Sequence, residues 1–260
     1  MVRRARLDAE LVRRGLARSR EQAAELVHAG RVRVGGSTAT KPATAVEPDT
    51  PVLVEDFSDD PDYASRGGHK LAGALDALPV PVDGRRVLDA GASTGGFTDV
   101  LLRRGAREVV AVDVGYGQLA WNLRTDPRVT VHDRTNVREL TPEQIGGPVD
   151  LTVADLSFIP LTLVLPALAA CTTEDLLPMV KPQFEVGKEL VGAKGVVRDP
   201  VLRGQAIQKV ADRAYELGLG TRGVARSPLP GPAGNIEFFL WLRRDAPPAD
   251  PADIARVVAP

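Results

Sequence analysis

The chain has 260 residues, a formal net charge of −1 and a hydrophobic fraction of 43%. This length and composition allow one or two globular domains with a buried core, and the near-zero charge excludes a molecule that is basic as a whole. The single cysteine, Cys171, excludes an internal disulfide framework and a cysteine-based zinc site, and it is typical of a protein of the reducing cytosol.

The charge is unevenly distributed along the chain. Residues 1–36 contain nine arginines and four acidic residues, so this end is basic although the whole is not. A basic end on a neutral protein indicates contact with a polyanion, but a solvated helical face would explain the same charges equally well. The charged start Met1–Asp8 contains no apolar stretch, so no secretory signal is expected.

The first 55 residues predict a small α/β domain. Polar residues that favour helix starts and glycines that end helices or form turns set its boundaries. The expected elements are a helix over Leu7–Leu16, a helix over Arg20–Ala29 that Ser19 caps and Gly30 ends, and strands over Arg31–Val34 and Pro51–Val54. The polar, acidic segment 55–65 is expected to be a linker.

Strands and helices alternate in the remainder, which predicts a mostly parallel sheet covered by helices on both faces. Ligands bind such sheets beyond the carboxyl ends of the strands. Strands are expected over Arg86–Asp89, Glu108–Asp113, Val149–Asp155, Leu176–Lys181, Thr221–Ser227 and Ile236–Leu242, and helices over 68–78, 96–104, 162–170 and 201–218.

One uncharged segment, Leu156–Thr173, is about as long as a membrane span. It contains Pro160 and Pro166 together with several hydroxyl side chains. We therefore predict a strand exit, a loop and a helix that covers the sheet, in preference to a transmembrane helix.

A glycine-rich loop follows the first strand of the sheet and begins a helix. Asp89, Gly91, Gly95 and Gly96 define it, and glycines let the backbone turn tightly and approach a ligand closely. A second acidic residue, Asp113, ends the next strand, where it can bind ribose hydroxyls.

This pattern also fits a dinucleotide site or a simple tight turn. Two features favour S-adenosylmethionine: Asp89 lies in the loop, where its carboxylate can face a cationic ligand, and two strands close the sheet near the end of the chain. A terminal strand hairpin is more typical of methyltransferase sheets than of dehydrogenase sheets.

Four further polar residues are candidates for the chemistry: Lys70, Asp155, Lys181 and Glu237. A ribose hydroxyl is a poor nucleophile until its proton is removed or polarised, and an ammonium group can stabilise the developing alkoxide. A lysine acting as the base would need a lowered pKa. Two lysines and two carboxylates could serve either mechanism, whereas each residue alone could equally be a solvated charge or a surface ion pair.

Several sequence strings together resemble the TlyA family, whose catalytic domain is similar to the FtsJ-type ribose 2′-O-methyltransferases. The strings are Ser65–Leu71, Leu88–Thr98, Asp113–Leu119, Ala154–Ile159 and Leu177–Glu185. The N-terminal unit looks like the S-four RNA-binding domain, on Arg6–Asp8, Ser19–Leu26, Gly30–Val34 and Lys41–Pro42.

The resemblance implies an α/β fold of Rossmann-like methyltransferase type, with a mostly parallel seven-stranded sheet that ends in an antiparallel hairpin. A small α/β RNA-binding domain would precede it. The domain boundaries expected are 1–60 for the RNA-binding domain, 61–66 for the linker and 67–260 for the methyltransferase domain.

The resemblance also implies S-adenosylmethionine-dependent 2′-O-methylation of cytidine in ribosomal RNA, in both 16S and 23S rRNA, with a link to capreomycin susceptibility. It places a catalytic tetrad on Lys70, Asp155, Lys181 and Glu237. The cofactor-binding residues expected are Asp89, Gly91, Ser93, Thr94, Gly95, Gly96, Phe97, Asp113, Val114, Asn136 and Asp155, and the RNA-binding residues are Arg4, Arg6, Arg18, Arg20, Lys41, Arg66, His69 and Lys188.

The expected protein is a cytoplasmic monomer that binds ribosomal RNA within ribosomal subunits, with no metal and no membrane contact. Two other functions stay open. Some family members carry a haemolysin label, which would require an exposed apolar segment such as Leu156–Thr173. A non-catalytic factor for ribosomal RNA binding or assembly would need none of the tetrad.

Overall fold

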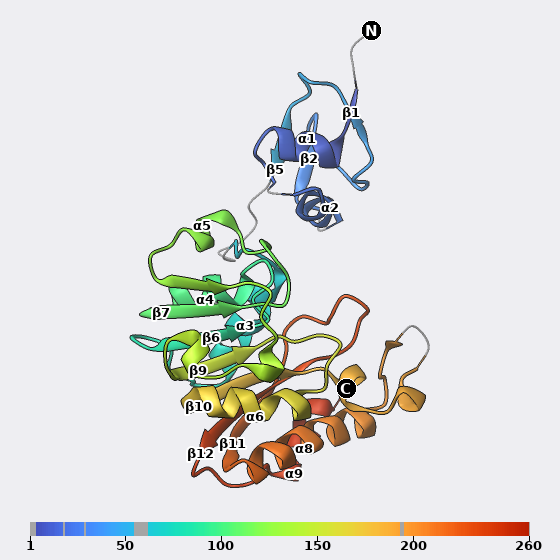
Figure 1. The fold of residues 1–260 in the computed structure, drawn as a ribbon. Helices are drawn as coiled ribbons and strands as arrows, with labels where there is room; N and C mark the ends of the chain where they lie inside the picture. Colours follow the sequence, from blue (N-terminus) through green and yellow to red (C-terminus); the bar gives the residue numbers. More distant parts are fainter. Residues whose placement is uncertain (1–3, 18, 29, 55–61, 193–194, 260) are drawn as a thin grey trace. The chain divides into compact units, whose positions relative to one another are not determined.

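The computed structural model describes residues 4–17, 19–28, 30–54, 62–192 and 195–259. The chain forms two compact units, Met1–Pro61 and Asp62–Pro260, and each is considered by itself (Figure 1). The predicted linker falls partly outside the described residues, while Asp62–Arg66 belong to the second unit.

The first unit packs two short helices against small sheets. Leu7, Leu11, Ala23 and Val27 meet in its core, and Ser19 Oγ accepts a hydrogen bond from the Gln22 backbone N–H at 3.1 Å, as its predicted capping role requires. The elements are β1 (Ala5–Arg6), α1 (Leu7–Arg13), α2 (Arg20–His28), β2 (Val32–Val34), β3 (Ser37–Thr38), β4 (Ala45–Val46) and β5 (Val52–Val54).

The first helix is shorter than the apolar pattern predicted. It ends at Arg13, and the next residue, Arg14, donates from its guanidinium to the carbonyl oxygens of Thr50 and Pro48 at 2.8 and 2.7 Å. The helix stops because Gly15 takes a left-handed φ of 71°, after which the Leu16 N–H bonds the Leu11 carbonyl oxygen at 2.8 Å. The strands β1, β3 and β4 were not predicted, because two residues carry no periodicity that a sequence pattern could reveal.

The second unit alternates strands and helices, as predicted. The elements are α3 (Arg66–Ala77), β6 (Arg86–Ala90), α4 (Gly96–Arg103), β7 (Glu108–Val112), α5 (Trp121–Arg124), β8 (Val129–His132), β9 (Val149–Ala154), α6 (Leu161–Cys171), β10 (Thr172–Val180), α7 (Pro182–Glu185), α8 (Pro200–Glu216), β11 (Leu219–Arg226), β12 (Phe238–Arg244) and α9 (Pro251–Val258). Short 3-10 turns lie at Val137–Glu139, Glu143–Ile145 and Lys188–Leu190.

The strands of this unit form one seven-stranded sheet in the order β11-β12-β10-β9-β6-β7-β8. The five strands from β10 to β8 run parallel, and β12 pairs antiparallel with both β10 and β11. The sheet therefore has the expected terminal hairpin. Its order reverses between β6 and β9, and such a reversal opens a crevice beyond the carboxyl ends of the strands.

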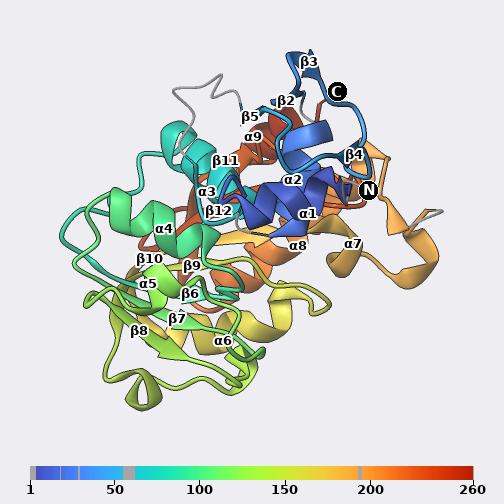
Figure 2. The same ribbon diagram turned by 90° about the horizontal axis from the view of Figure 1, so that it is seen from above.

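Helices cover both faces of this sheet (Figures 1 and 2). Residues of α6, α8 and α9 pack on one face, whereas residues of α3, α4 and α5 pack on the other. Successive residues of a strand point to opposite faces, so on β12 Phe238 and Leu240 enter the first layer and Phe239 and Trp241 enter the second.

The uncharged segment Leu156–Thr173 forms the covering helix that the sequence predicted. Leu161, Leu165 and Leu168 of α6 are almost fully buried against the sheet. Within the described residues, no helix has both the length and the apolar character needed to cross a bilayer.

Several elements of the second unit differ from expectation, and the short helices α5 and α7 were not predicted. The strand β10 begins at Thr172 rather than Leu176, because Thr172 and Asp175 already pair with β9. The short edge strand β8 was not predicted. The helix α9 was not predicted either, and Asp250 caps it by accepting a hydrogen bond from the Ala252 backbone N–H at 2.8 Å.

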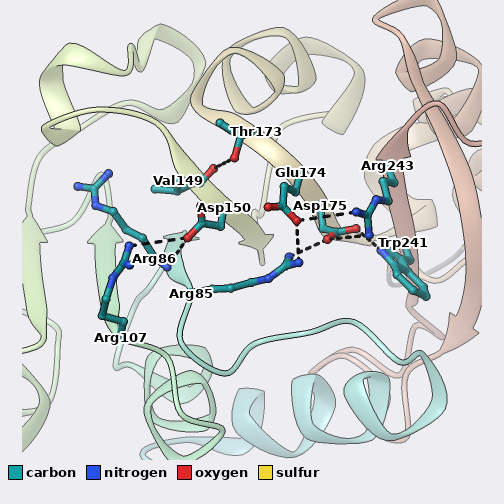
Figure 3. A network of polar contacts seen from close by, with 10 residues as sticks. All are labelled: Arg85, Arg86, Arg107, Val149, Asp150, Thr173, Glu174, Asp175, Trp241 and Arg243. Carbon is teal, nitrogen blue, oxygen red and sulfur yellow. Dashed lines mark hydrogen bonds and ion pairs between the residues drawn. The ribbon is translucent and has the colours of Figure 1, made fainter.

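A polar network joins the strands at the edge opposite the crevice (Figure 3). Asp175 is fully buried and accepts hydrogen bonds from Arg85 and from the Trp241 indole, both at 2.7 Å, while Arg243 lies 3.6 Å away. Glu174 bonds the same Arg85 at 2.8 Å from a half-exposed position. Asp175 thus ties β10 and β12 to the turn that precedes β6.

We predict that Asp175→Ala lowers the free energy of unfolding by about 3–5 kcal/mol, because it leaves the largely buried Arg85 guanidinium and the Trp241 N–H without their partner. Urea unfolding followed by circular dichroism measures the change. The control is Glu174→Ala, whose exposed ion pair should contribute about 1 kcal/mol or less. Equal losses in the two variants would contradict this account.

Candidate active site

Two lysine–carboxylate pairs lie at the carboxyl edge of the sheet. Lys181 follows β10, and its Nζ lies 2.6 Å from Asp155 Oδ1 and donates to Ser157 Oγ at 2.8 Å. Asp155 and Ser157 belong to the segment that leaves β9. The Lys181 side chain is 9% exposed and that of Asp155 is 25% exposed, so this pair can still be reached from solvent.

The second pair is more deeply buried. Lys70 of α3 donates from Nζ to Glu237 Oε2 at 2.6 Å, and Glu237 is only 1% exposed. Glu237 directly precedes β12. The pair therefore links the helix that opens the second unit to the strand that closes the sheet.

Strand register brings the tetrad to one edge. Pro178 of β10 lies opposite Ala154 of β9, and Val180 lies opposite Phe238 of β12. Asp155 and Lys181 continue β9 and β10, and Glu237 precedes β12. These three residues therefore lie beside one another. The four residues of the predicted tetrad therefore lie at one edge of the sheet, whereas their catalytic role stays a prediction.

The glycine-rich loop lies next to this cluster. Gly91 has a φ of +88°, and a Cβ at this position would lie 2.5 Å from the carbonyl oxygen of Asp155. Gly95, with a φ of +99°, forms the left-handed turn that begins α4. Glycine is required at both positions, because a residue with a side chain would have a strained backbone at these positive φ angles. At position 91 the side chain would also push the loop away from the segment that leaves β9.

The two acidic residues of the predicted cofactor site have different surroundings. Asp113 Oδ2 accepts the Ser93 N–H at 2.8 Å and Oδ1 accepts the Gly115 N–H at 2.7 Å, so it organises the loops after β6 and β7. Asp89 is fully buried, and its Oδ2 accepts a hydrogen bond from the Thr98 hydroxyl at 2.6 Å. Burial raises the pKa of Asp89 to about 7.

Asp89 is thus not open to solvent in the way that its position in the loop suggested. Its Oδ2 is directed at α4, while its Oδ1 is buried without a hydrogen-bond partner among the described residues. The sequence pattern cannot predict this orientation, because Thr98 lies nine positions away on the following helix.

The other residues expected to bind a cofactor fall into two groups. Ser93 and Thr94 are exposed on the loop, Ser93 with a left-handed φ of 47°, and Val114 is 76% exposed. Phe97 is instead buried 6.1 Å from the Phe239 ring, so only its backbone is near the loop. The exposed Asn136 uses its side chain to accept the Arg138 N–H at 3.1 Å.

The arginines expected to bind RNA are exposed but organised by acidic residues. The buried Asp8 carboxylate bonds Arg6 at 2.8 Å and Arg20 at 3.1 Å, and the hydrogen bond from Arg6 lowers the pKa of Asp8 to about 2. Arg4 pairs with Glu47 at 3.0 Å.

The remaining RNA-binding candidates lie in several environments. Lys41 and Arg66 are exposed, and His69 is half-buried with its ring 5.1 Å from that of Tyr63. Arg18 lies outside the described residues, as does the Lys188 side chain.

Sequence reasoning missed four residues that shape the site: Ser157, Phe158, Glu185 and Asn235. Phe158 is 91% exposed, has a left-handed φ of 66° and packs against Phe184 at 5.4 Å. Asn235 is buried and bonds Val197 N and Gly195 O at 2.9 and 2.8 Å, which fixes the loop that carries Glu237. Their closeness in sequence to Asp155, Lys181 and Glu237 was the one signal available.

No cluster of histidine, cysteine, aspartate and glutamate side chains suited to a metal ion occurs among the residues that the structure describes. The polar groups at the sheet edge are lysine–carboxylate pairs. The site therefore offers ammonium groups, carboxylates and backbone N–H groups for its chemistry.

The sheet order, the glycine-rich loop and the paired lysines define the class of the protein. Residues 63–244 match the FtsJ-like methyltransferase family and residues 5–52 match the S4 domain, so the chain belongs to the FtsJ-like methyltransferases and carries an N-terminal S4 domain.

Individual relatives place it further within this class. The chain is 65% identical over 245 residues to the 16S/23S rRNA (cytidine-2′-O)-methyltransferase TlyA of Mycobacterium tuberculosis, which covers 94% of this chain and 91% of that protein. It is 34% identical to Hemolysin A of Brachyspira hyodysenteriae, over 90% of this chain and 98% of that one. The predicted resemblance to the TlyA family is confirmed.

A solved structure supports the fold over the whole chain. A Streptococcus thermophilus protein described as a candidate hemolysin superposes with a TM-score of 0.78 at 38% identity, over 99% of this chain and 95% of that one.

We predict that Gly91→Ala weakens binding of S-adenosylmethionine at least about tenfold, because the added Cβ collides with the Asp155 carbonyl and displaces the loop. Isothermal titration calorimetry measures the affinity. Gly84→Ala is the matched control, since Gly84 also has a positive φ, +70°, but a Cβ added there would have no atom within 4 Å. An unchanged affinity in Gly91→Ala would contradict the assigned loop.

Proposed function

We propose that this protein transfers a methyl group from S-adenosylmethionine to the ribose 2′-hydroxyl of cytidine in ribosomal RNA. The single observation that carries the proposal is the Lys181 ammonium, which bonds Asp155 and Ser157 at the open edge beside the glycine-rich loop. The name of the M. tuberculosis relative supports the substrate and extends the proposal to both 16S and 23S rRNA.

The residues present fit the proposed cofactor. Gly91 and Gly95 let the backbone approach the cofactor closely. The carboxylate oxygens of Asp113 can also accept hydrogen bonds from ribose hydroxyls, and the unpartnered buried Asp89 Oδ1 can accept one from a cationic group. When bound, S-adenosylmethionine supplies a methyl group on a positively charged sulfur, which is electrophilic.

Lys181 is the residue that we expect to bind the attacking hydroxyl. Its Nζ already donates to Ser157 and forms an ion pair with Asp155, so a further donor position can hold a ribose oxygen and stabilise the charge that develops on it. The carboxylate of Asp155 is the nearest acceptor for the proton that the hydroxyl loses as the new carbon–oxygen bond forms. This favours the stabilising role for Lys181 over that of a free base.

The Lys70–Glu237 pair is proposed to shape the same edge from the other side. Because Glu237 is buried and neutralises Lys70, the two side chains remain fixed with little net charge. Fixed polar groups cost no reorganisation during the reaction, which makes them suited to positioning a substrate.

RNA contact is proposed for both units. The exposed arginines of the S4 domain can bind phosphates, which position the substrate, whereas the 2′-hydroxyl at Lys181 distinguishes RNA from DNA. The exposed ring of Phe158 offers a face on which an unstacked base can lie. A protein that modifies ribosomal subunits would act in the cytoplasm, and capreomycin susceptibility would depend on it.

The two alternative functions lack comparable support. The haemolysin hypothesis depended on the segment Leu156–Thr173, which is packed into the sheet unit. A non-catalytic assembly factor would have no need of a lysine held between a carboxylate and a hydroxyl at a cofactor loop.

We predict that Lys181→Ala reduces methyl transfer to isolated ribosomal subunits by at least about a hundredfold, because the hydroxyl loses the ammonium that stabilises its developing charge. Tritium incorporation from labelled S-adenosylmethionine measures the rate. Cofactor affinity should be unchanged, and Ser157→Ala, which retains the Asp155–Lys181 pair, should lose less. Full activity in Lys181→Ala would exclude the proposed role of Lys181, whereas no methyl transfer by the unmodified protein would favour an assembly factor.

We predict that Arg20→Glu weakens subunit binding and reduces the slope of log affinity against log salt by about 0.7–0.9 for each phosphate that the variant no longer binds. Filter binding between 50 and 200 mM salt measures the slope. The control is Arg256→Glu on α9, where an exposed arginine also pairs with an aspartate. If the two variants keep the same slope as the unmodified protein, the S4 domain does not bind RNA through this arginine.

A further inference from the structure

Helix α6 has no capping side chain of its own. The residue at its N-cap is Pro160, whose side chain cannot accept a hydrogen bond, and the first turn contains no acidic residue. The first backbone N–H groups of a helix have no partner within the helix and need an acceptor from elsewhere.

Glu185 supplies that acceptor from a different element. It ends α7, and its Oε1 accepts the Leu161 backbone N–H at 2.7 Å. The Glu185 side chain is almost fully buried, and Lys209 of α8 donates from Nζ to the Glu185 carbonyl oxygen at 2.7 Å. Glu185 is therefore bonded to α6 through its carboxylate and to α8 through its carbonyl oxygen, and α6 and α8 lie side by side in both ribbon views (Figures 1 and 2).

This contact spans the two segments that carry the active-site pair. Residues 155–160 connect β9 to α6, and residues 181–185 continue from β10 through α7. The segments meet at one end through Lys181 with Asp155, in the middle through the Phe158 and Phe184 rings, and at the other end through Glu185 with Leu161.

We propose that Glu185 is a positioning residue for methyl transfer: by capping α6 from α7, its carboxylate fixes the Asp155 segment relative to Lys181. The inference rests on the function proposed above. A shift of about 1 Å in a catalytic group can slow a reaction about a hundredfold, so a contact at the far end of the segment can control the rate.

The charge of Glu185 has a cost that helps to test this role. Burial raises its pKa to about 7 from the ordinary value of 4.5, so stability that is present below pH 4.5 is lost as the pH rises through 7. The charged groups around it are Lys209 on α8, Lys181 at the start of α7 and Asp155 beyond the aromatic pair, whereas α6 contains no charged residue.

The test uses the full-length chain with isolated subunits as substrate and compares Glu185→Ala with Glu185→Gln. At saturating substrates and pH 8.5 we expect kcat to fall about thirtyfold or more in the alanine variant, with unchanged affinity for S-adenosylmethionine. Glutamine keeps a neutral acceptor for the Leu161 N–H, so its kcat should fall only about threefold, and that difference should vanish near pH 6, where Glu185 is itself protonated.

Thermal unfolding separates a positioning role from a purely structural one, because a purely structural role would make the slower variant the less stable one. Glu185→Gln should have a higher Tm than the unmodified protein at pH 8.5 but not near pH 4, below the ordinary pKa of the side chain, although it is the slower enzyme. Asp250→Ala removes a comparable carboxylate cap from α9 and should leave kcat unchanged.

Wild-type kcat in Glu185→Ala, or a glutamine variant as slow as the alanine variant, would overturn the positioning role. The absence of methyl transfer by the unmodified chain would instead overturn the proposed function, and this inference with it.

Discussion

The proposed reaction of this protein depends on the contact between Lys181 and Asp155 across the exits of two neighbouring parallel strands. The 2.6 Å pair forms because β9 and β10 are in register and both strands end at the same edge. Gly91 approaches the same exit so closely that no side chain fits there. The proposed methyl donor and the proposed acceptor therefore converge on a single backbone region.

The rest of the second unit holds this edge in place. At the opposite edge, the buried Asp175 ties β10 and β12 to the turn before β6, and at the near edge Glu185 and Asn235 fix the segments that follow β10 and precede β12. An apolar layer covers each face of the sheet between these two edges. The sheet is thus a rigid support on which four charged side chains keep fixed positions, as electrostatic stabilisation of a reaction requires.

Much of this organisation could be predicted from the sequence. The alternation of strands and helices led to the correct sheet type, and the glycine-rich loop and the strand-end residues Asp155 and Lys181 lie at the edge where such sheets bind ligands. What could not be predicted depends on contacts between residues apart in the sequence: the orientation of Asp89 depends on Thr98 of the following helix. The early end of α1 had a local signal in Gly15, whose left-handed φ of 71° stops the helix. Glu185 looked like one charge in a short string, because its partner Leu161 begins a helix 24 positions earlier.

The central claim is that the Lys181 edge transfers a methyl group to a ribose hydroxyl of ribosomal RNA. Its most direct test is incubation of the purified protein with isolated 30S and 50S subunits and S-adenosylmethionine, followed by nuclease digestion and mass spectrometry of the nucleosides. The account predicts 2′-O-methylcytidine at a defined position. A methyl group on a base, or no methylated nucleoside in either subunit, would contradict it.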